Sequence, residues 1–168
     1  MTYIRKQYHA LRERILEPRH FMQILAGPRQ VGKSTLVGQV LDDISIPYTL
    51  EVADAVDPKD SDWIHRVWES ARATMQIRKE QERLWGIDEV QKIPELLDEV
   101  HWLIANRGIH FILCGSSARK LKRSGANLLG GRAIRKTLHP LVSAEIPDFD
   151  IDKAINVGML PRHYLVSS

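Results

Sequence analysis

Short apolar runs alternate along the chain with longer stretches in which apolar residues recur every three or four positions. The short runs have the length of buried strands, whereas the recurring pattern is typical of helices with one buried face. The predicted strands are residues 21–26, 47–52, 84–89, 109–114 and 133–138. The predicted helices are residues 1–18, 34–41, 63–79, 94–107 and 118–129. Strands that alternate with helices in this way predict an α/β fold, with a parallel sheet covered on both faces.

The apolar stripes of two helices show which faces they bury. In residues 1–18 the polar side is occupied by Arg5, Lys6, Arg12 and Arg14, and the helix is expected to end before Pro18. Its stripe consists of Ile4, Tyr8, Leu11 and Ile15. We expect this helix to pack on the sheet rather than on a membrane. The stripe of residues 63–79 consists of Ile64, Val67, Trp68, Ala71 and Met75.

Length and composition limit the class of protein. A chain of 168 residues is the size of one domain and can bury a core without a metal or a disulfide. Its single cysteine, Cys114, lies in an apolar run, which is typical of a small buried side chain in a reducing compartment. The apolar runs are far shorter than a membrane span needs, and no secretory signal opens the chain. We therefore expect a cytoplasmic protein without a membrane partner.

A glycine-rich loop separates the first predicted strand from the next helix. From Gly27 to Ser34 it reads G-P-R-Q-V-G-K-S. Such a loop can bend so that its backbone N–H groups converge on phosphate oxygens at the N-terminal end of the helix. Lys33 would then add a positive charge at the β- and γ-phosphates, and the Ser34 hydroxyl would be a Mg²⁺ ligand. The flanking strand and helix disfavour the alternative, a turn that only joins them. The pattern predicts a nucleotide site.

Two carboxylates end the predicted strand 84–89. Asp88 is expected beside the glycine-rich loop, because the carboxyl ends of parallel strands meet at one edge of a sheet. There it can hold Mg²⁺ through a coordinated water. Glu89 is suited to polarising a water directed at the γ-phosphate. An exposed carboxylate at a strand end is the other interpretation of Glu89. The pair favours hydrolysis over phosphate transfer to a small molecule.

Two residues farther along the chain are candidates for contacts with the γ-phosphate. Ser116 follows the strand 109–114, where its hydroxyl can bond the γ-phosphate or the attacking water; capping the next helix is the alternative. Arg132 precedes the last strand, from which it can reach a nucleotide held by a second subunit. That role implies a homo-oligomer with a trans-acting arginine. Arg119 and Arg123 compete for it.

Positive charge is concentrated in one segment. The formal net charge is only +3, but residues 119–136 contain seven basic side chains and no acidic one. Such a segment can receive phosphates or a polyanion. Nucleic acid is a weakly supported partner, because no aromatic residue lies among the basic ones. A solvated surface is the alternative interpretation.

Several motifs together resemble one family. They are the segments 27–35, 87–94, 115–121, 125–133 and 139–141. The chain resembles the AAA-type P-loop ATPases of bacteria and archaea over about residues 15–165. The resemblance implies a three-layer α/β/α sandwich whose five-stranded parallel sheet has the order 5-1-4-3-2. It also implies ATP and Mg²⁺ as cofactors, metal ligands at Ser34 and Asp88, and catalytic roles for Lys33, Glu89, Ser116 and Arg132. The implied nucleotide-binding residues are Gly27, Pro28, Arg29, Gln30, Val31, Gly32, Lys33, Ser34 and Thr35.

The resemblance also divides the chain. We expect an N-terminal amphipathic helix at 1–18, the nucleotide-binding sheet and helices at 19–140, and the start of a helical lid at 141–168. Family members continue past a Gly-x-Leu-Pro segment, matched by residues 158–161, into a lid and a C-terminal domain. This chain ends at Ser168, so we expect an N-terminal ATPase core in which turnover is impaired more than binding.

Three functions compete on this evidence. The first is a Mg²⁺-dependent ATPase. The second is a nucleotide-loaded switch or scaffold with little turnover, which presents the basic surface to a protein or nucleic-acid partner. The third, a small-molecule kinase, is disfavoured by the Asp88–Glu89 pair. The preference for adenine over guanine stays open.

Overall fold

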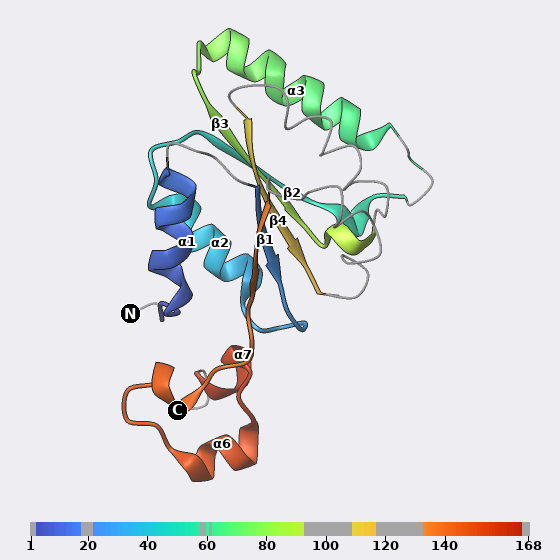
Figure 1. Cartoon of the computed structure of the whole chain (residues 1–168). Coiled ribbons are helices and arrows are strands. Elements are labelled where there is room, and N and C mark those ends of the chain that lie inside the picture. The colour runs from blue at the N-terminus through green and yellow to red at the C-terminus, as the bar shows by residue number, and fades with distance from the viewer. Residues whose placement is uncertain are drawn as a thin grey trace.

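A parallel sheet of five strands forms the centre of the structure (Figure 1). The computed structural model describes residues 3–17, 22–57, 60, 62–92, 109–116 and 133–165. The strands lie in the order β2-β3-β4-β1-β5, which confirms the predicted order 5-1-4-3-2 written from the other edge. Their bounds are Met22–Ala26 for β1, Tyr48–Val52 for β2, Arg83–Asp88 for β3, Ile109–Gly115 for β4 and Ala133–Thr137 for β5.

Helices flank the sheet, and further short helices lie beyond one of its ends (Figure 1). The longer described helices are α1 (Gln7–Leu16), α2 (Lys33–Asp42) and α3 (Trp63–Arg78). The shorter ones are α6 (Ile151–Val157), α7 (Pro161–Tyr164) and the 3₁₀ turns η1 (Ala53–Ala55), η2 (Val90–Lys92) and η3 (Ser143–Glu145). In Figure 1 α6 and α7 lie past the carboxyl ends of β1 and β5.

On the face of the sheet toward α3, aromatic rings of the helix and of two strands stack on one another. Trp68 of α3 stacks against Phe111 of β4, with ring centroids 6.1 Å apart, and against Trp85 of β3 at 6.0 Å. Ile64 and Ala71 lie in the same buried stripe of the helix. The predicted stripe of this helix is confirmed, since its two remaining members are partly buried against the same core.

The opposite face packs against α1 and α2. Leu11 and Ile15 of α1 share one core cluster with Leu36 and Val40 of α2 and with Leu25 of β1. Helix α1, predicted to pack on the sheet, is therefore part of the core cluster that α2 and the sheet form on this face. Since each buried aliphatic side chain contributes about 1.5–3 kcal/mol, this cluster fixes α2 firmly at the carboxyl end of β1.

The start of the N-terminal helix differs from the prediction. The helix begins at Gln7, and the preceding Ile4 is 53% exposed, so Ile4 is not part of the buried stripe. Arg5, predicted on the polar side, is only 5% exposed. Polar partners far along the chain, rather than helical periodicity, determine the position of Arg5. The predicted helices 94–107 and 118–129 lie outside the described residues.

The edge strand β2 is less covered than a fully buried parallel strand. It pairs with β3, and Tyr48, Leu50 and Val52 on one of its faces are 40–51% exposed.

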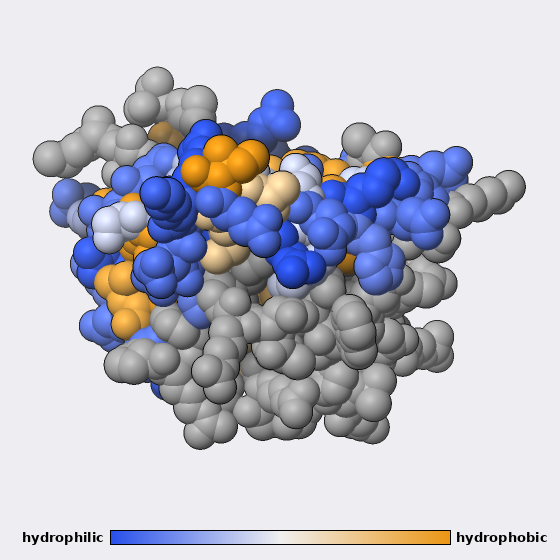
Figure 2. All heavy atoms as spheres, turned by 90° about the horizontal axis from the view of Figure 1, so that it is seen from above, coloured by the Kyte–Doolittle hydropathy of each residue, from blue (hydrophilic) through white to orange (hydrophobic). Residues whose placement is uncertain are grey.

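On the side viewed in Figure 2, where α3 lies, the described residues are mostly hydrophilic, with small hydrophobic areas among them. Among the described residues, no helix is both long and apolar enough to cross a lipid bilayer.

Candidate functional site

The glycine-rich loop starts where three chain segments meet. Strand β1 ends at Ala26, whose carbonyl accepts a hydrogen bond from the Leu138 N–H at 2.7 Å. The Gly27 N–H donates to the carbonyl of Gly115, at the end of β4, at 3.3 Å. A Cβ atom at Gly27 would lie 2.1 Å from the Leu138 carbonyl oxygen. Glycine is required here because the backbone that follows β5 occupies the space of a side chain.

The end of the loop joins directly to helix α2. Gly32 is the N-cap in the left-handed region, with φ 87°, and its carbonyl accepts from Leu36 N–H at 2.9 Å. Since glycine has no side chain that could cap the helix, the N–H groups in the first turn of α2 can donate hydrogen bonds to a ligand. Gln30 is also left-handed, with φ 64°, which costs a non-glycine residue about 1–2 kcal/mol. The loop is therefore held in an unfavourable backbone shape by its surroundings.

Lys33 extends back along the inside of the loop. Its ammonium group donates to the carbonyl oxygen of Pro28 at 2.7 Å and to that of Gly27 at 3.1 Å, and the residue is 5% exposed. An ammonium group among backbone carbonyls and helix N–H groups forms a positive centre at the N-terminal end of α2. An anion is the ligand that such a centre favours.

The other polar group of this helix turn contacts the neighbouring strand. The Ser34 hydroxyl donates a hydrogen bond to Asp88 Oδ2, at the end of β3. The other oxygen of the same carboxylate accepts from the Glu89 N–H at 2.8 Å. Glu89 is left-handed, with φ 57°, and half-buried. The sequence-predicted pair Ser34 and Asp88 is thus brought together across 54 positions of the chain.

A hydroxyl and a carboxylate in contact are a suitable donor set for Mg²⁺. Magnesium prefers oxygen ligands and is usually held by one or two protein groups, together with waters and phosphate oxygens. Ser34 and Asp88 fit this requirement. In the described part of the chain no cluster of three or more His, Cys, Asp and Glu residues is arranged to hold a metal ion.

The remaining predicted residues lie around this centre. Ser116 directly follows Gly115, whose carbonyl accepts a hydrogen bond from the start of the loop. Arg29 and Thr35 are exposed. Arg132 and its competitors Arg119 and Arg123 lie outside the described residues.

An ion pair joins the turns η1 and η2, which follow β2 and β3, near the loop. Lys92 Nζ lies 2.9 Å from Asp54 Oδ1. The pKa of Asp54 is lowered mainly by this lysine and, to a smaller degree, by Arg29 of the loop. Positive charge from the loop therefore reaches the ends of β2 and β3.

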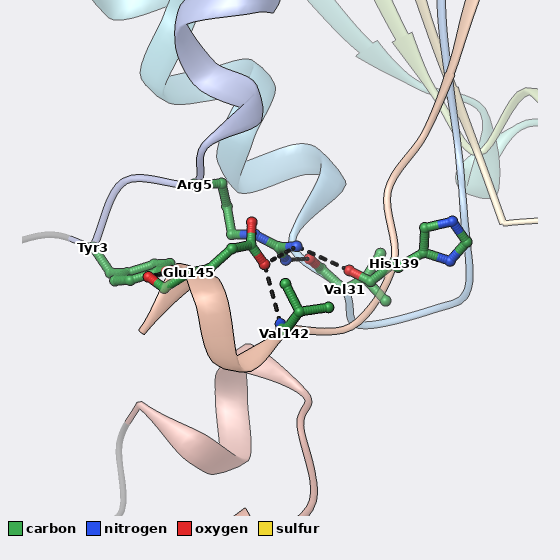
Figure 3. A network of polar contacts seen from close by, with 6 residues as sticks. All are labelled: Tyr3, Arg5, Val31, His139, Val142 and Glu145. Carbon is green, nitrogen blue, oxygen red and sulfur yellow. Dashed lines mark hydrogen bonds and ion pairs between the residues drawn. The ribbon is translucent and has the colours of Figure 1, made fainter. Parts of the chain in front are cut away.

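Sequence reasoning missed one set of residues at this site. Arg5, from the segment before α1, donates to the carbonyl of Val31 within the glycine-rich loop (Figure 3). It also bonds the His139 carbonyl and the Glu145 carboxylate. No local motif signals these contacts, because Arg5 and Glu145 are 140 positions apart.

The loop, the lysine and the serine–aspartate contact lie together at the carboxyl end of a sheet with the strand order 5-1-4-3-2. The family model described as AAA domain matches residues 19–147, which is well over half of the chain. The chain belongs to the AAA domain family. The matched range includes the loop, Asp88, Glu89 and Ser116. No curated protein matches the chain.

Membership of the AAA domain family indicates the general function of the site. The family is one of P-loop ATPase-like domains, which indicates nucleotide binding. The family match begins after Pro18, so Arg5 and helix α1 lie before the matched range. Both contact the AAA domain that follows them in the chain.

Proposed function

We propose that the chain binds ATP together with Mg²⁺ and hydrolyses the γ-phosphate. The observation that supports this best is the contact between Ser34, in the first turn of α2, and Asp88, at the end of β3. A loop that only joined a strand to a helix would not need a carboxylate from another strand against its first helical hydroxyl. We assign the phosphates to residues 27–35, with the backbone N–H groups of residues 29–35 as donors, and the metal to Ser34 and Asp88.

Each side chain then has a role that follows from its chemistry. Lys33 lies inside the loop, and phosphate oxygens are stronger acceptors for its ammonium group than the carbonyls of Gly27 and Pro28. Ser34 and Asp88 would hold Mg²⁺, which would supply positive charge to neutralise the phosphate oxygens. Glu89, whose backbone is fixed by the Asp88 carboxylate, orients the attacking water and takes its proton.

Two roles concern the surroundings of the phosphates. We assign Ser116 to a hydrogen bond with the γ-phosphate or the attacking water, since it follows the Gly115 carbonyl bonded to Gly27. We assign Arg132 to the phosphates of a nucleotide held by a second subunit. If so, phosphate release per mole of protein rises with protein concentration, and Arg132→Ala removes the rise.

Binding of nucleic acid stays a prediction. It is tested by measuring whether nucleic acid binds at low salt and whether that binding weakens as the salt concentration is raised.

Residues 141–165 are proposed as the first part of a lid over the nucleotide. Leu160 packs against the core cluster that holds α2. The Pro161 ring lies 3.8 Å from the position that a Cβ at Gly32 would take. The segment therefore reaches the phosphate loop from the side of α7, where it can cover a ligand seated on the loop.

The proposal is tested by measuring ATP binding and phosphate release in the same samples. Glu89→Gln is expected to bind ATP as the wild type does and to release phosphate at least about 100-fold more slowly. Glu69→Gln, which changes an exposed carboxylate on α3, is the matched control and is expected to keep wild-type turnover.

Three results would change the conclusion. Unchanged turnover in Glu89→Gln would remove Glu89 from the mechanism. ATP binding without phosphate release in the wild type would favour the nucleotide-loaded switch. If the wild type bound no nucleoside triphosphate, the proposal would be overturned.

A further inference from the structure

The Arg5 side chain donates hydrogen bonds to three residues that lie far from it in the sequence, Val31, His139 and Glu145. Its Nη1 donates to the Val31 carbonyl at 3.0 Å, and its Nη2 donates to the His139 carbonyl at 3.0 Å (Figure 3). Its Nε and Nη2 donate to the two carboxylate oxygens of Glu145 at 3.1 and 3.0 Å. The Arg5 and Glu145 side chains are 5% and 2% exposed. This is a buried, hydrogen-bonded charge pair, and its geometry is fixed.

The carbonyl that Arg5 holds lies at a sensitive point of the loop. Val31 stands between Gln30 and Gly32, which both have positive φ. The Val31–Gly32 peptide bond is trans, so the Val31 C=O and the Gly32 N–H point in opposite directions in one rigid plane. By holding the carbonyl, Arg5 directs the Gly32 N–H away from itself. That N–H belongs to the proposed phosphate-binding loop.

The other contacts of Arg5 keep its guanidinium in place. Glu145 accepts from the Val142 N–H at 3.2 Å as well, and Tyr3 donates to the Glu145 carbonyl at 2.8 Å. His139 follows Leu138, whose carbonyl is the atom that requires glycine at position 27. Arg5 therefore connects the loop to the segment after β5 on one side and to η3 on the other.

We propose that Arg5 is a positioning residue for the phosphate loop: through the Val31 carbonyl it fixes the direction of the Gly32 N–H toward a bound phosphate group. Glu145 balances its buried charge. The proposal rests on the proposed function, and the family match does not supply it, because the matched range begins after Arg5. Lysine cannot replace the fork of donors, since its ammonium group bonds from a single point.

The test needs a variant that removes the contact and still folds. Arg5→Met alone leaves Glu145 buried without a counter-charge, which destabilises a fold. The double variant Arg5→Met/Glu145→Gln removes both charges and keeps an acceptor for the Val142 N–H. The control is Arg12→Met, which removes an arginine of α1 that pairs with Asp43 at the surface, away from the loop.

Two measurements separate positioning from folding. In ¹⁵N-glycine-labelled protein without nucleotide, the Gly32 amide resonance is expected to move in the double variant, while that of Gly38 within α2 stays. Titration of the folded double variant with Mg²⁺ and ATP is expected to give a Kd about tenfold higher than that of the wild type, measured at a temperature where a melting curve shows that both proteins are folded. Arg5→Lys is expected to lose less than the double variant and is the variant to measure if the double variant does not fold. Arg12→Met is expected to match the wild type in both measurements.

The outcomes distinguish this inference from the proposed function. A wild type that binds no ATP contradicts the proposed function, and the Gly32 resonance still tests what Arg5 does to the loop. A wild type that binds ATP, with a folded double variant of equal affinity and an unmoved Gly32 resonance, overturns the role of Arg5.

Discussion

Replacement of Gly27 by alanine should damage the molecule far more than a single methyl group suggests. The added Cβ would lie 2.1 Å from the Leu138 carbonyl oxygen and 3.1 Å from the carbonyl carbon. Both atoms are backbone, so no side-chain rotation relieves the contact. Either the start of the glycine-rich loop or the chain after β5 must shift by about 0.9 Å to reach the 3.0 Å that real contacts keep.

The magnitude follows from what such a shift breaks. The hydrogen bond from Leu138 N–H to the Ala26 carbonyl, 2.7 Å long, joins the two segments that must separate. Its loss costs about 1 kcal/mol, and forcing an extra carbon into a packed site costs about 1–3 kcal/mol. We therefore expect Gly27→Ala to lower the free energy of unfolding by about 2–4 kcal/mol. For a domain of this size the melting temperature falls by about 5–15 °C.

Gly38→Ala is the matched control. Gly38 lies inside α2, and no atom lies within 4 Å of a Cβ added there. Because alanine is the better helix former, this variant should be more stable than the wild type by about 0.5–1 kcal/mol. Urea denaturation followed by circular dichroism measures both variants. A Gly27→Ala protein as stable as the wild type would refute the steric reasoning, and so would equal losses in the two variants.

Three further predictions concern the rest of the domain. Hydrogen bonds from the Tyr8 hydroxyl and from Arg12 lower the pKa of Asp43, so the stability that Asp43 contributes is present above about pH 4 and is lost as the pH falls through the lowered pKa. The free energy of unfolding from urea titrations should therefore change less between pH 7 and pH 3 in Asp43→Asn than in the wild type, and an equal change would contradict this. Burial raises the pKa of the Cys114 thiol, so a thiol reagent at pH 8 should modify it only after denaturant is added, whereas rapid labelling of the native protein would show that the end of β4 is open. Trp68→Ala removes a ring stacked on two aromatic residues of the sheet and should cost about 3–5 kcal/mol in urea denaturation; a loss below about 1 kcal/mol would contradict the role of this stack.

The strands and the three longer described helices, α1, α2 and α3, could be predicted from the sequence because each one forms its own local pattern. Strands β1 and β3 are buried at every position and are mainly apolar, although β1 contains Gln23 and β3 has Arg83 and Asp88 at its ends. Helix α3 keeps its apolar stripe on helical spacing and differs from the prediction by one residue at its end. In these segments the local pattern and the tertiary environment agree, so periodicity was sufficient.

The centre of the candidate site could also be predicted, because a loop motif and a strand-end carboxylate meet by topology. In a parallel sheet the carboxyl ends share one edge, so Ser34 and Asp88 approach each other although 54 positions separate them. Their contact needed no information beyond the order of strands and helices. Their chemical roles stay predictions.

The N-terminal segment could not be predicted in the same way. Periodicity placed Ile4 inside and Arg5 outside, and the structure has the reverse exposure for both. Arg5 is buried because Glu145 and the Val31 carbonyl satisfy its charge and its donors. Burial of a charge depends on partners in space, and no local pattern in the sequence encodes a partner so far along the chain.

The edge of the sheet shows a second limit. The predicted strand 47–52 belongs to a sheet that was expected to be covered on both faces, yet Tyr48, Leu50 and Val52 are substantially exposed on β2. Alternation indicates which residues share a face, but it does not say whether another element lies over that face. Position within the sheet decides this, and position depends on the topology of the whole domain.

Calorimetric titration with ATP in the presence of Mg²⁺ tests the central claim most directly. The wild type should give saturable heat with about one ATP bound per chain, and Lys33→Ala should give none at the same concentrations, because the ammonium group inside the loop is lost. If the wild type gives no saturable heat with millimolar ATP or GTP, or if Lys33→Ala binds as tightly as the wild type, the loop is not a nucleotide-phosphate site.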